Sequence, residues 1–122
     1  MPPALNNPSI MEDPLSLRLA ALSDPTRRAI LARLALGEAN VTELAQPFGI
    51  SQPAISRHLK VLETAGLIET RQIAQSRLRR LRPGALDEVS AWLAELRHVW
   101  ADRFDRLEDY LTAVAPPENK AD

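Results

Sequence analysis

The stretch ISQPAISRHLKVLETAGLI, residues 50–68, carries the clearest local signals in the chain. Ser51 suits a helix N-cap and Pro53 suits the first turn, where a missing backbone N–H costs little. Gly66 stands where the helix should end, because glycine readily takes the left-handed conformation that follows a C-cap. Apolar residues recur every three or four positions and predict one buried face. That face consists of Ile55, Leu59, Leu62 and Ala65.

The opposite face of this helix is polar. Glutamine and arginine form paired hydrogen bonds with base edges in the major groove, and cations bind phosphates. An ordinary solvated helix face could have the same composition, so the helix alone leaves both interpretations open. The polar residues are Gln52, Ser56, Arg57, Lys60 and Glu63.

A shorter helix is predicted immediately upstream, in VTELAQPFGI, residues 41–50. Thr42 is a candidate N-cap and Gly49 breaks the helix. Pro47 removes a backbone donor and crowds the carbonyl of Glu43, so we expect this helix to be short and tightened or kinked at its end. A helix, a short turn containing glycine and a second helix form the helix-turn-helix pattern.

Two short runs downstream, IETRQIA and RLRRLRP, predict a β-hairpin around Gln75 and Ser76. No Asn-Gly or Gly-Gly pair marks the turn, so its type and length stay open. Basic charge is concentrated in residues 42–82, with seven basic and three acidic side chains, although the whole chain has a net charge of −1. A basic helix and hairpin are typical of a surface that faces a nucleic-acid duplex.

Three further helices are predicted: residues 15–22, a helix that begins at Asp24-Pro25 and stops at Gly37, and a long helix over about residues 86–114. The long helix has an apolar face too broad for one small core, so it needs a partner surface. Packing on its own domain is the alternative. We expect a homodimer built from this helix and helix 15–22. The predicted interface consists of Leu15, Leu19, Leu93, Leu96, Trp100, Phe104, Leu107 and Leu111.

The order of these parts resembles the ArsR/SmtB family of bacterial winged-helix repressors. The resemblance lies in DPTRRAILARL, then VTELAQPFGISQPAISRHLKVLETAGLI, then the Arg-rich hairpin and the long final helix, and it covers about residues 15–112. It implies a winged helix-turn-helix fold, mainly α with five helices and a β-hairpin wing. It also implies a homodimer that binds an operator palindrome in double-stranded DNA and leaves it when an effector arrives. The final helix resembles a branch of the family without the usual metal-sensing cysteines.

On this basis the polar side chains receive provisional roles. We expect Gln52, Ser56 and Arg57 to touch base edges, Ser51 and Lys60 to touch phosphates, and His58 to lie at the groove edge or pack. Arg77 and Arg79 share one face of a strand, because side chains alternate, and are expected to hold the flanking backbone or minor groove. Two alternatives remain: a protein-interaction module that does not read DNA, and a cysteine-free, zinc-responsive repressor.

Other functions find little support. The chain has no cysteine, which excludes disulfides, thiolate catalysis and cysteine-based metal sites. His98 shares a helix face with Glu95 and Asp102, but a zinc site needs more ligands, so we expect no metal and no cofactor. No phosphate-binding loop or nucleophile–base pair indicates an enzyme.

The expected organisation is one domain over residues 14–115, with disordered tails at residues 1–13 and 116–122. No apolar run is long enough to cross a membrane, and the first residues lack the basic and apolar regions of a signal peptide. A cytoplasmic location is therefore expected.

Overall fold

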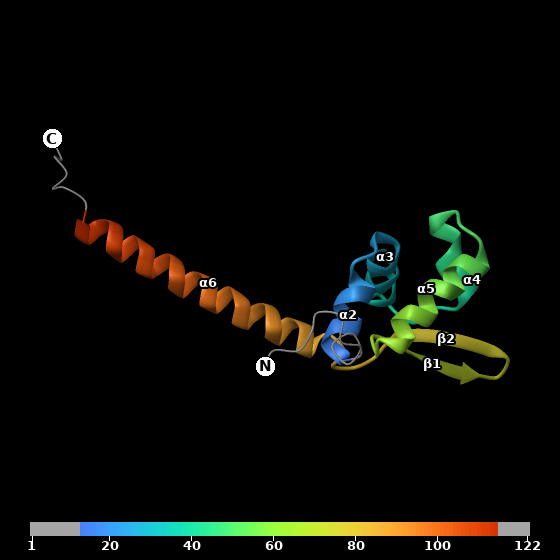
Figure 1. Cartoon of the computed structure of the whole chain (residues 1–122). Coiled ribbons are helices and arrows are strands. Elements are labelled where there is room, and N and C mark those ends of the chain that lie inside the picture. The colour runs from blue at the N-terminus through green and yellow to red at the C-terminus, as the bar shows by residue number, and fades with distance from the viewer. Residues whose placement is uncertain (1–12, 115–122) are drawn as a thin grey trace. The chain divides into compact units, whose positions relative to one another are not determined.

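A computed structural model describes residues 13–114. Over this range the chain has five α-helices, one 3-10 helix and one antiparallel two-stranded sheet (Figure 1), which confirms the predicted fold class. In chain order the elements are α2 (Pro14–Leu22), α3 (Pro25–Leu34), α4 (Val41–Ala45), η1 (Gln46–Phe48), α5 (Gln52–Thr64), β1 (Ile68–Ile73), β2 (Ser76–Leu81) and α6 (Asp87–Val114). The contacts divide the chain into two compact units, with the boundary between Val89 and Ser90.

Aspartate followed by proline begins both of the first two helices. The carboxylate of Asp13 accepts a hydrogen bond from the backbone N–H of Ser16 at 2.8 Å, and that of Asp24 accepts one from Arg27 at 3.0 Å. These bonds lower the pKa of both carboxyls below the ordinary value, because they stabilise the charged form. Asp13 was the last residue of the predicted N-terminal tail. The rest of both predicted tails lies outside the described residues, and the single domain over residues 14–115 stays a prediction.

The core of the first unit lies where α2, α3, α4, α5 and the base of the hairpin meet. The face of α5 predicted to be buried is buried, including Ile55, Leu59 and Leu62. The largest side chains with almost no exposed surface are Ile30, Leu44, Ile55, Leu59, Leu62 and Leu67. This packing holds α5 with its polar face outward.

The helix-turn-helix differs from the prediction at one cap. The N-cap of α4 is Asn40, not Thr42: the Asn40 side chain accepts from the backbone N–H of Glu43 at 2.9 Å, and the Glu43 carboxylate accepts from the backbone N–H of Asn40 at 2.9 Å. This reciprocal pair satisfies two donors, which a cap at Thr42 would not do. The tightened end predicted at Pro47 is confirmed, since the chain there forms η1.

The predicted start and stop of α5 are confirmed. The Ser51 hydroxyl accepts from the backbone N–H of Ala54 at 3.2 Å, and Gly66 follows the helix with a φ of 76°. The hairpin then forms with a two-residue loop, Ala74 and Gln75, because Ile73 pairs with Ser76. Figure 1 shows it running out below α5.

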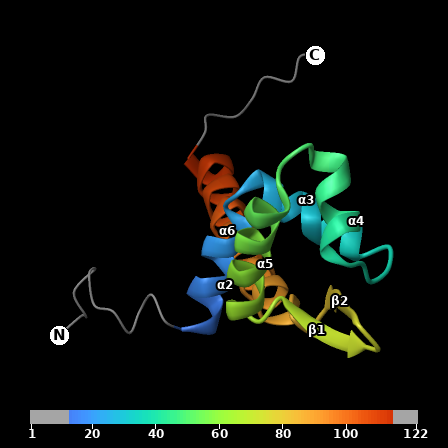
Figure 2. The same ribbon diagram turned by 90° about the vertical axis from the view of Figure 1, so that its right-hand side faces the viewer.

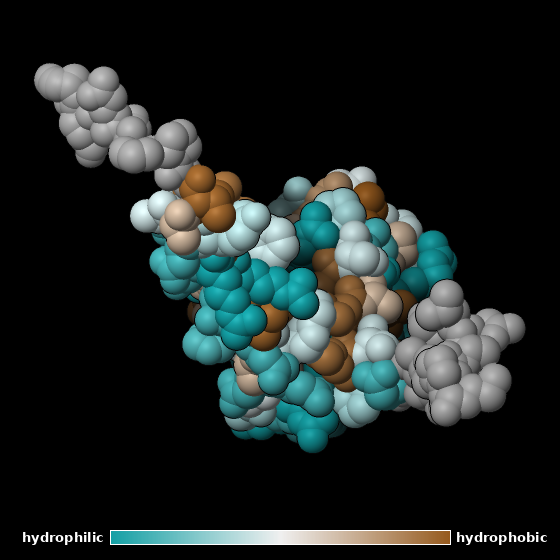
Figure 3. All heavy atoms as spheres, turned by 60° about the vertical axis from the view of Figure 1, so that its left-hand side comes forward, coloured by the Kyte–Doolittle hydropathy of each residue, from teal (hydrophilic) through white to brown (hydrophobic). Residues whose placement is uncertain are grey.

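The second unit consists of α6 after Val89. Within the described part of this helix, no side chain beyond Val89 is buried. Trp100 and Phe104 form an aromatic pair with ring centroids 6.2 Å apart. Figure 3 shows hydrophobic side chains at the surface where α6 adjoins the grey C-terminal residues. No helix among the described residues is long and apolar enough to cross a membrane.

Candidate nucleic-acid interface

The exposed face of α5 carries most of the side chains predicted to touch DNA. Gln52, Arg57 and Lys60 are all exposed, as are Ser51 and Ser56. The Gln52 side-chain amide donates to the hydroxyl of Thr42 on α4 at 3.2 Å. This bond places Gln52 beside the first helix of the motif, and it gives Thr42, predicted only as a cap, a contact with a candidate DNA-binding side chain.

His58 lies apart from this face. Its Nδ1 is 3.4 Å from Nη1 of Arg27 and 3.9 Å from Oδ2 of Asp24, and its side chain is 25% exposed. Both neighbours belong to the start of α3. Of the two roles proposed for His58, packing therefore fits the geometry better than a position at the groove edge.

The register of the hairpin separates its arginines into two sets. Thr70 pairs with Arg79 and Gln72 with Arg77, whereas Glu69 pairs with Arg80 and Arg71 pairs with Leu78. Because side chains alternate along a strand, Arg77 and Arg79 share the face of Thr70. The Thr70 hydroxyl donates to the carboxylate of Glu63 on α5 at 2.8 Å, so this face of the wing is turned toward α5.

The other set of arginines is paired with acids. Arg71 forms an ion pair with Glu38 at 3.1 Å, and Arg80 forms one with Glu69 at 2.6 Å. No ion pair among residues 13–114 includes Arg77 or Arg79, nor Arg57 or Lys60 on α5. No direct ion pair therefore neutralises these four cations, although the charge of Glu63 acts on Arg79.

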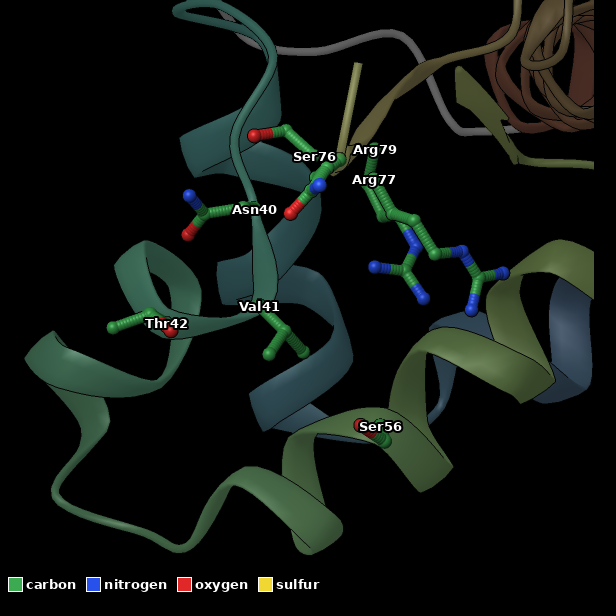
Figure 4. Close-up of a pocket in the computed structure, with 8 residues that line it drawn as sticks. Asn40, Val41, Thr42, Ser56, Ser76, Arg77 and Arg79 are labelled. Atoms are coloured by element: carbon green, nitrogen blue, oxygen red, sulfur yellow. The ribbon is translucent and has the colours of Figure 1, made fainter. Parts of the chain in front are cut away.

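A polar groove of about 370 Å³ lies between the wing, the start of α4 and α5. In Figure 4, Arg77 and Arg79 extend toward the helix that carries Ser56. Desolvation, and then the neighbouring positive charge of Arg77, lower the pKa of the Arg79 guanidinium from its ordinary value. Two neighbouring positive charges at a partly desolvated site attract an anion.

The opposite wall of the groove includes two residues that the sequence analysis did not connect with DNA. Asn40 and Thr42 line it together with Val41. Ala39 and Arg79 exchange backbone hydrogen bonds of 3.0 and 2.8 Å, which tie this loop to β2. Figure 2 shows α4 and the hairpin on the same side of the unit as α5. A capping box beginning at Asn40 was visible in the sequence, but its closeness to the wing was not.

The possible metal ligands on α6 do not gather into a site. Among residues 13–114, no group of three or more histidine and acidic side chains could hold a metal ion. Asp102 instead forms a surface ion pair with Arg106 at 3.1 Å.

The residues predicted to form the dimer interface lie on both units. Leu15 and Leu19 are half-buried on α2. The α6 members keep between 46% and 64% of their surface exposed, which is unusual for large apolar side chains unless a partner covers them. These members are Leu93, Leu96, Trp100, Phe104, Leu107 and Leu111.

Comparison with known proteins gives the class of this fold and site. Residues 24–70, from the N-cap of α3 into β1, match the family described as bacterial regulatory protein, arsR family. The chain is 45% identical over 80 residues to the HTH-type transcriptional regulator Rv2034 of Mycobacterium tuberculosis, covering 66% of this chain and 72% of that protein. It is 37% identical over 73 residues to the transcriptional repressor SdpR of Bacillus subtilis, covering 60% and 81%.

Solved structures agree with this assignment. An ArsR family transcriptional regulator, RHA00566, superposes with a TM-score of 0.67 at 39% identity, over 73% of this chain and 98% of that one. The homodimeric winged helix-turn-helix DNA-binding domain of Mb0332 from Mycobacterium bovis superposes with a TM-score of 0.57 at 28% identity, over 84% and 91%. The chain belongs to the ArsR family of winged helix-turn-helix transcriptional regulators, and it is a member without cysteine.

Proposed function

We propose that this protein is a homodimeric transcriptional repressor that binds a twofold-symmetric operator in double-stranded DNA. The observation that carries the proposal is a set of four cations that form no ion pair within residues 13–114: Arg57 and Lys60 on α5, and Arg77 and Arg79 on the wing. Two of them lie on the second helix of the helix-turn-helix and two on the adjoining wing, although the whole chain is slightly acidic. SdpR is named a transcriptional repressor, which supports repression rather than activation for this protein.

The proposed contacts follow from exposure and chemistry. The side chains of Gln52, Ser56 and Arg57 would read base edges in the major groove, because they lie on the exposed face of one helix. Ser51 and Lys60 would bind phosphates beside them. The groove between α5 and the wing would take the flanking backbone, with Arg77 and Arg79 facing the same phosphate strand.

Dimerisation completes the proposal. One recognition helix reads too few base pairs for useful specificity, and two copies related by a twofold axis would read two half-sites. The exposed apolar face of α6, with Leu15 and Leu19 of α2, is the proposed interface. The Mb0332 domain, which is described as homodimeric, supports this assembly.

The remaining assignments are parts of the same proposal. The protein acts without catalysis, metal or cofactor, and works in the cytoplasm, where the DNA is. An effector, if one exists, is an organic molecule, because soft metals and arsenite require thiolate ligands that this chain lacks.

Binding to DNA at several salt concentrations tests the proposal. The logarithm of the association constant should fall linearly with the logarithm of salt concentration, because each neutralised phosphate releases counterions. DNA from upstream of the protein's own gene should bind more tightly than random DNA of equal length. Absence of salt-dependent binding to either DNA would favour a protein-interaction module instead.

A further inference from the structure

Within the first unit, a single arginine on α2 contacts the end of α5 and the first turn of α6. The Nε of Arg18 donates to the backbone carbonyl of Ala65 at 2.9 Å, and its Nη1 donates to Oε1 of Glu88 at 3.0 Å. Ala65 is the C-cap of α5, and Glu88 is the second residue of α6. The Arg18 side chain is 16% exposed and that of Glu88 is 49% exposed, so the bond to Ala65 is the more sheltered of the two contacts.

The end of α5 is built around this guanidinium. Gly66 turns the chain away from α5 with a φ of +76°, and a Cβ at this position would lie 3.0 Å from Nη2 of Arg18. The last turn of α5 contains no basic residue of its own. Because the carbonyls at a helix C-terminus carry partial negative charge, Arg18 supplies the cation that this end lacks.

We propose that Arg18 is a positioning residue for DNA binding, through which the first turn of α6 sets the direction of α5. The inference rests on the proposed function, in which α6 forms the dimer and α5 reads the DNA. Two recognition helices meet two half-sites only if each α5 is held at a fixed angle to the dimer helices. Arg18 donates hydrogen bonds to the C-cap of α5 and to Glu88 in the first turn of α6, a turn that belongs to the same unit as α5.

Substitutions at both ends of this connection test the role. Arg18→Gln removes the charge-assisted bonds and should weaken binding to the palindrome roughly tenfold, while binding to random DNA and the dimer dissociation constant stay within about twofold. Glu88→Gln should weaken palindrome binding roughly threefold, because Glu88 is half exposed. The double variant should bind no more weakly than Arg18→Gln alone, since both changes break the same connection.

Arg28→Gln is the matched control. Nη1 of Arg28 also donates to a helix-end carbonyl, that of Leu22 at 2.8 Å, but this bond joins only α3 and α2. The control should leave palindrome binding unchanged. Equal losses on palindrome and random DNA in Arg18→Gln, or loss of its dimer, would overturn the positioning role, because misfolding or failed assembly would then explain the effect.

Hydrogen–deuterium exchange of the free protein tests the connection without DNA. Arg18→Gln and Glu88→Gln should both speed exchange of the amides in residues 62–68, and Arg28→Gln should not. If Glu88→Gln leaves exchange in this segment unchanged, the connection from α6 to α5 is overturned whatever the DNA results are. A parent protein that binds no DNA would refute the proposed function, whereas the exchange data would still decide whether α6 controls the end of α5.

Discussion

Arg80 and Glu69 face each other across the hairpin: Nε of Arg80 donates to Oε2 of Glu69 at 2.7 Å, and its Nη2 forms an ion pair with the same oxygen at 2.6 Å. With the Arg71–Glu38 pair, this leaves the charge of one hairpin face largely neutralised. The other face keeps Arg77 and Arg79 without an ion pair among the described residues, and the charge of Glu63 acts on Arg79. The two faces should therefore contribute differently to DNA binding.

Replacing Arg77 and Arg79 together by Ala should weaken binding to operator and random DNA alike. The slope of the logarithm of the association constant against the logarithm of salt concentration should become shallower by about one to two, because one or two phosphate contacts are lost. The matched control replaces Arg71 and Arg80 by Ala, which removes the same charge from the same hairpin. Binding titrations at several salt concentrations compare the two variants. Equal slopes would mean that the pairing of arginines with acids does not select the DNA-facing side.

The exposed face of α5 should control discrimination between sequences. Replacing Gln52 or Arg57 by Ala should cost roughly 1–3 kcal/mol on the operator and much less on random DNA, because a base contact is lost. Thr64→Ala is the control, since Thr64 is exposed on the same helix but lines the cleft toward α2. Circular dichroism checks that the fold is intact. Equal losses on both DNAs would show that these side chains only hold the backbone.

The interface on α6 can be tested with one added charge. Leu107→Asp or Leu111→Asp should produce monomers with much weaker operator binding, because an unpaired carboxylate would be buried at the contact. Thr112→Asp adds the same charge about 140° around the helix from Leu107, given 3.6 residues per turn, and should stay dimeric. Sedimentation velocity measures the oligomeric state of each variant. A dimeric Leu107→Asp with normal binding would place the interface elsewhere.

Stability should depend on pH through the helix caps. The pKa of Asp24 is lowered from 3.8 chiefly by the hydrogen bond from the N–H of Arg27. Because the pKa is lower in the folded state, the ionised carboxylate stabilises the fold at any pH above the pKa of the unfolded state. This stabilisation is lost as the pH falls through the pKa of the folded state. The free energy of unfolding should thus decline below about pH 4. In Asp24→Asn, which keeps a cap oxygen but has no carboxyl to protonate, it should decline less.

Urea unfolding between about pH 6 and pH 2 measures this difference. Asp105→Asn on α6 is the control, because Asp105 caps no helix. Identical pH profiles for Asp24→Asn and the parent protein would show that the Asp24 cap does not cause the loss of stability at low pH.

The sequence predicted the elements whose signals are local, such as Ser51 at the start of α5 and Gly66 after its end. The N-cap of α4 was predicted wrongly, although a local signal was present: Asn40 and Thr42 are both good caps, but only Asn40 has a glutamate three residues later, Glu43, with which it forms the capping box. The distant partners were not predictable: the pairing of Arg80 with Glu69 depends on the hairpin register, and the contacts of Arg18 span 47 and 70 residues of chain.

Metal ions should not control this protein. Zinc, cadmium or arsenite at micromolar concentration should leave a preformed operator complex intact, because the chain has no thiolate and the described residues hold no metal-binding group. Titrating zinc against that complex, with His98→Ala alongside, is the measurement. Release by zinc in the parent but not in His98→Ala would make the protein a zinc-responsive repressor.

Footprinting on the DNA upstream of the protein's own gene tests the central claim most directly. A homodimer reading a palindrome should protect two symmetric half-sites with centres about one helical turn, or 10 base pairs, or a multiple of that distance apart. Both half-sites should lose protection together in Leu107→Asp. A single unsymmetrical site, or no protected site on DNA that the protein binds, would contradict the account.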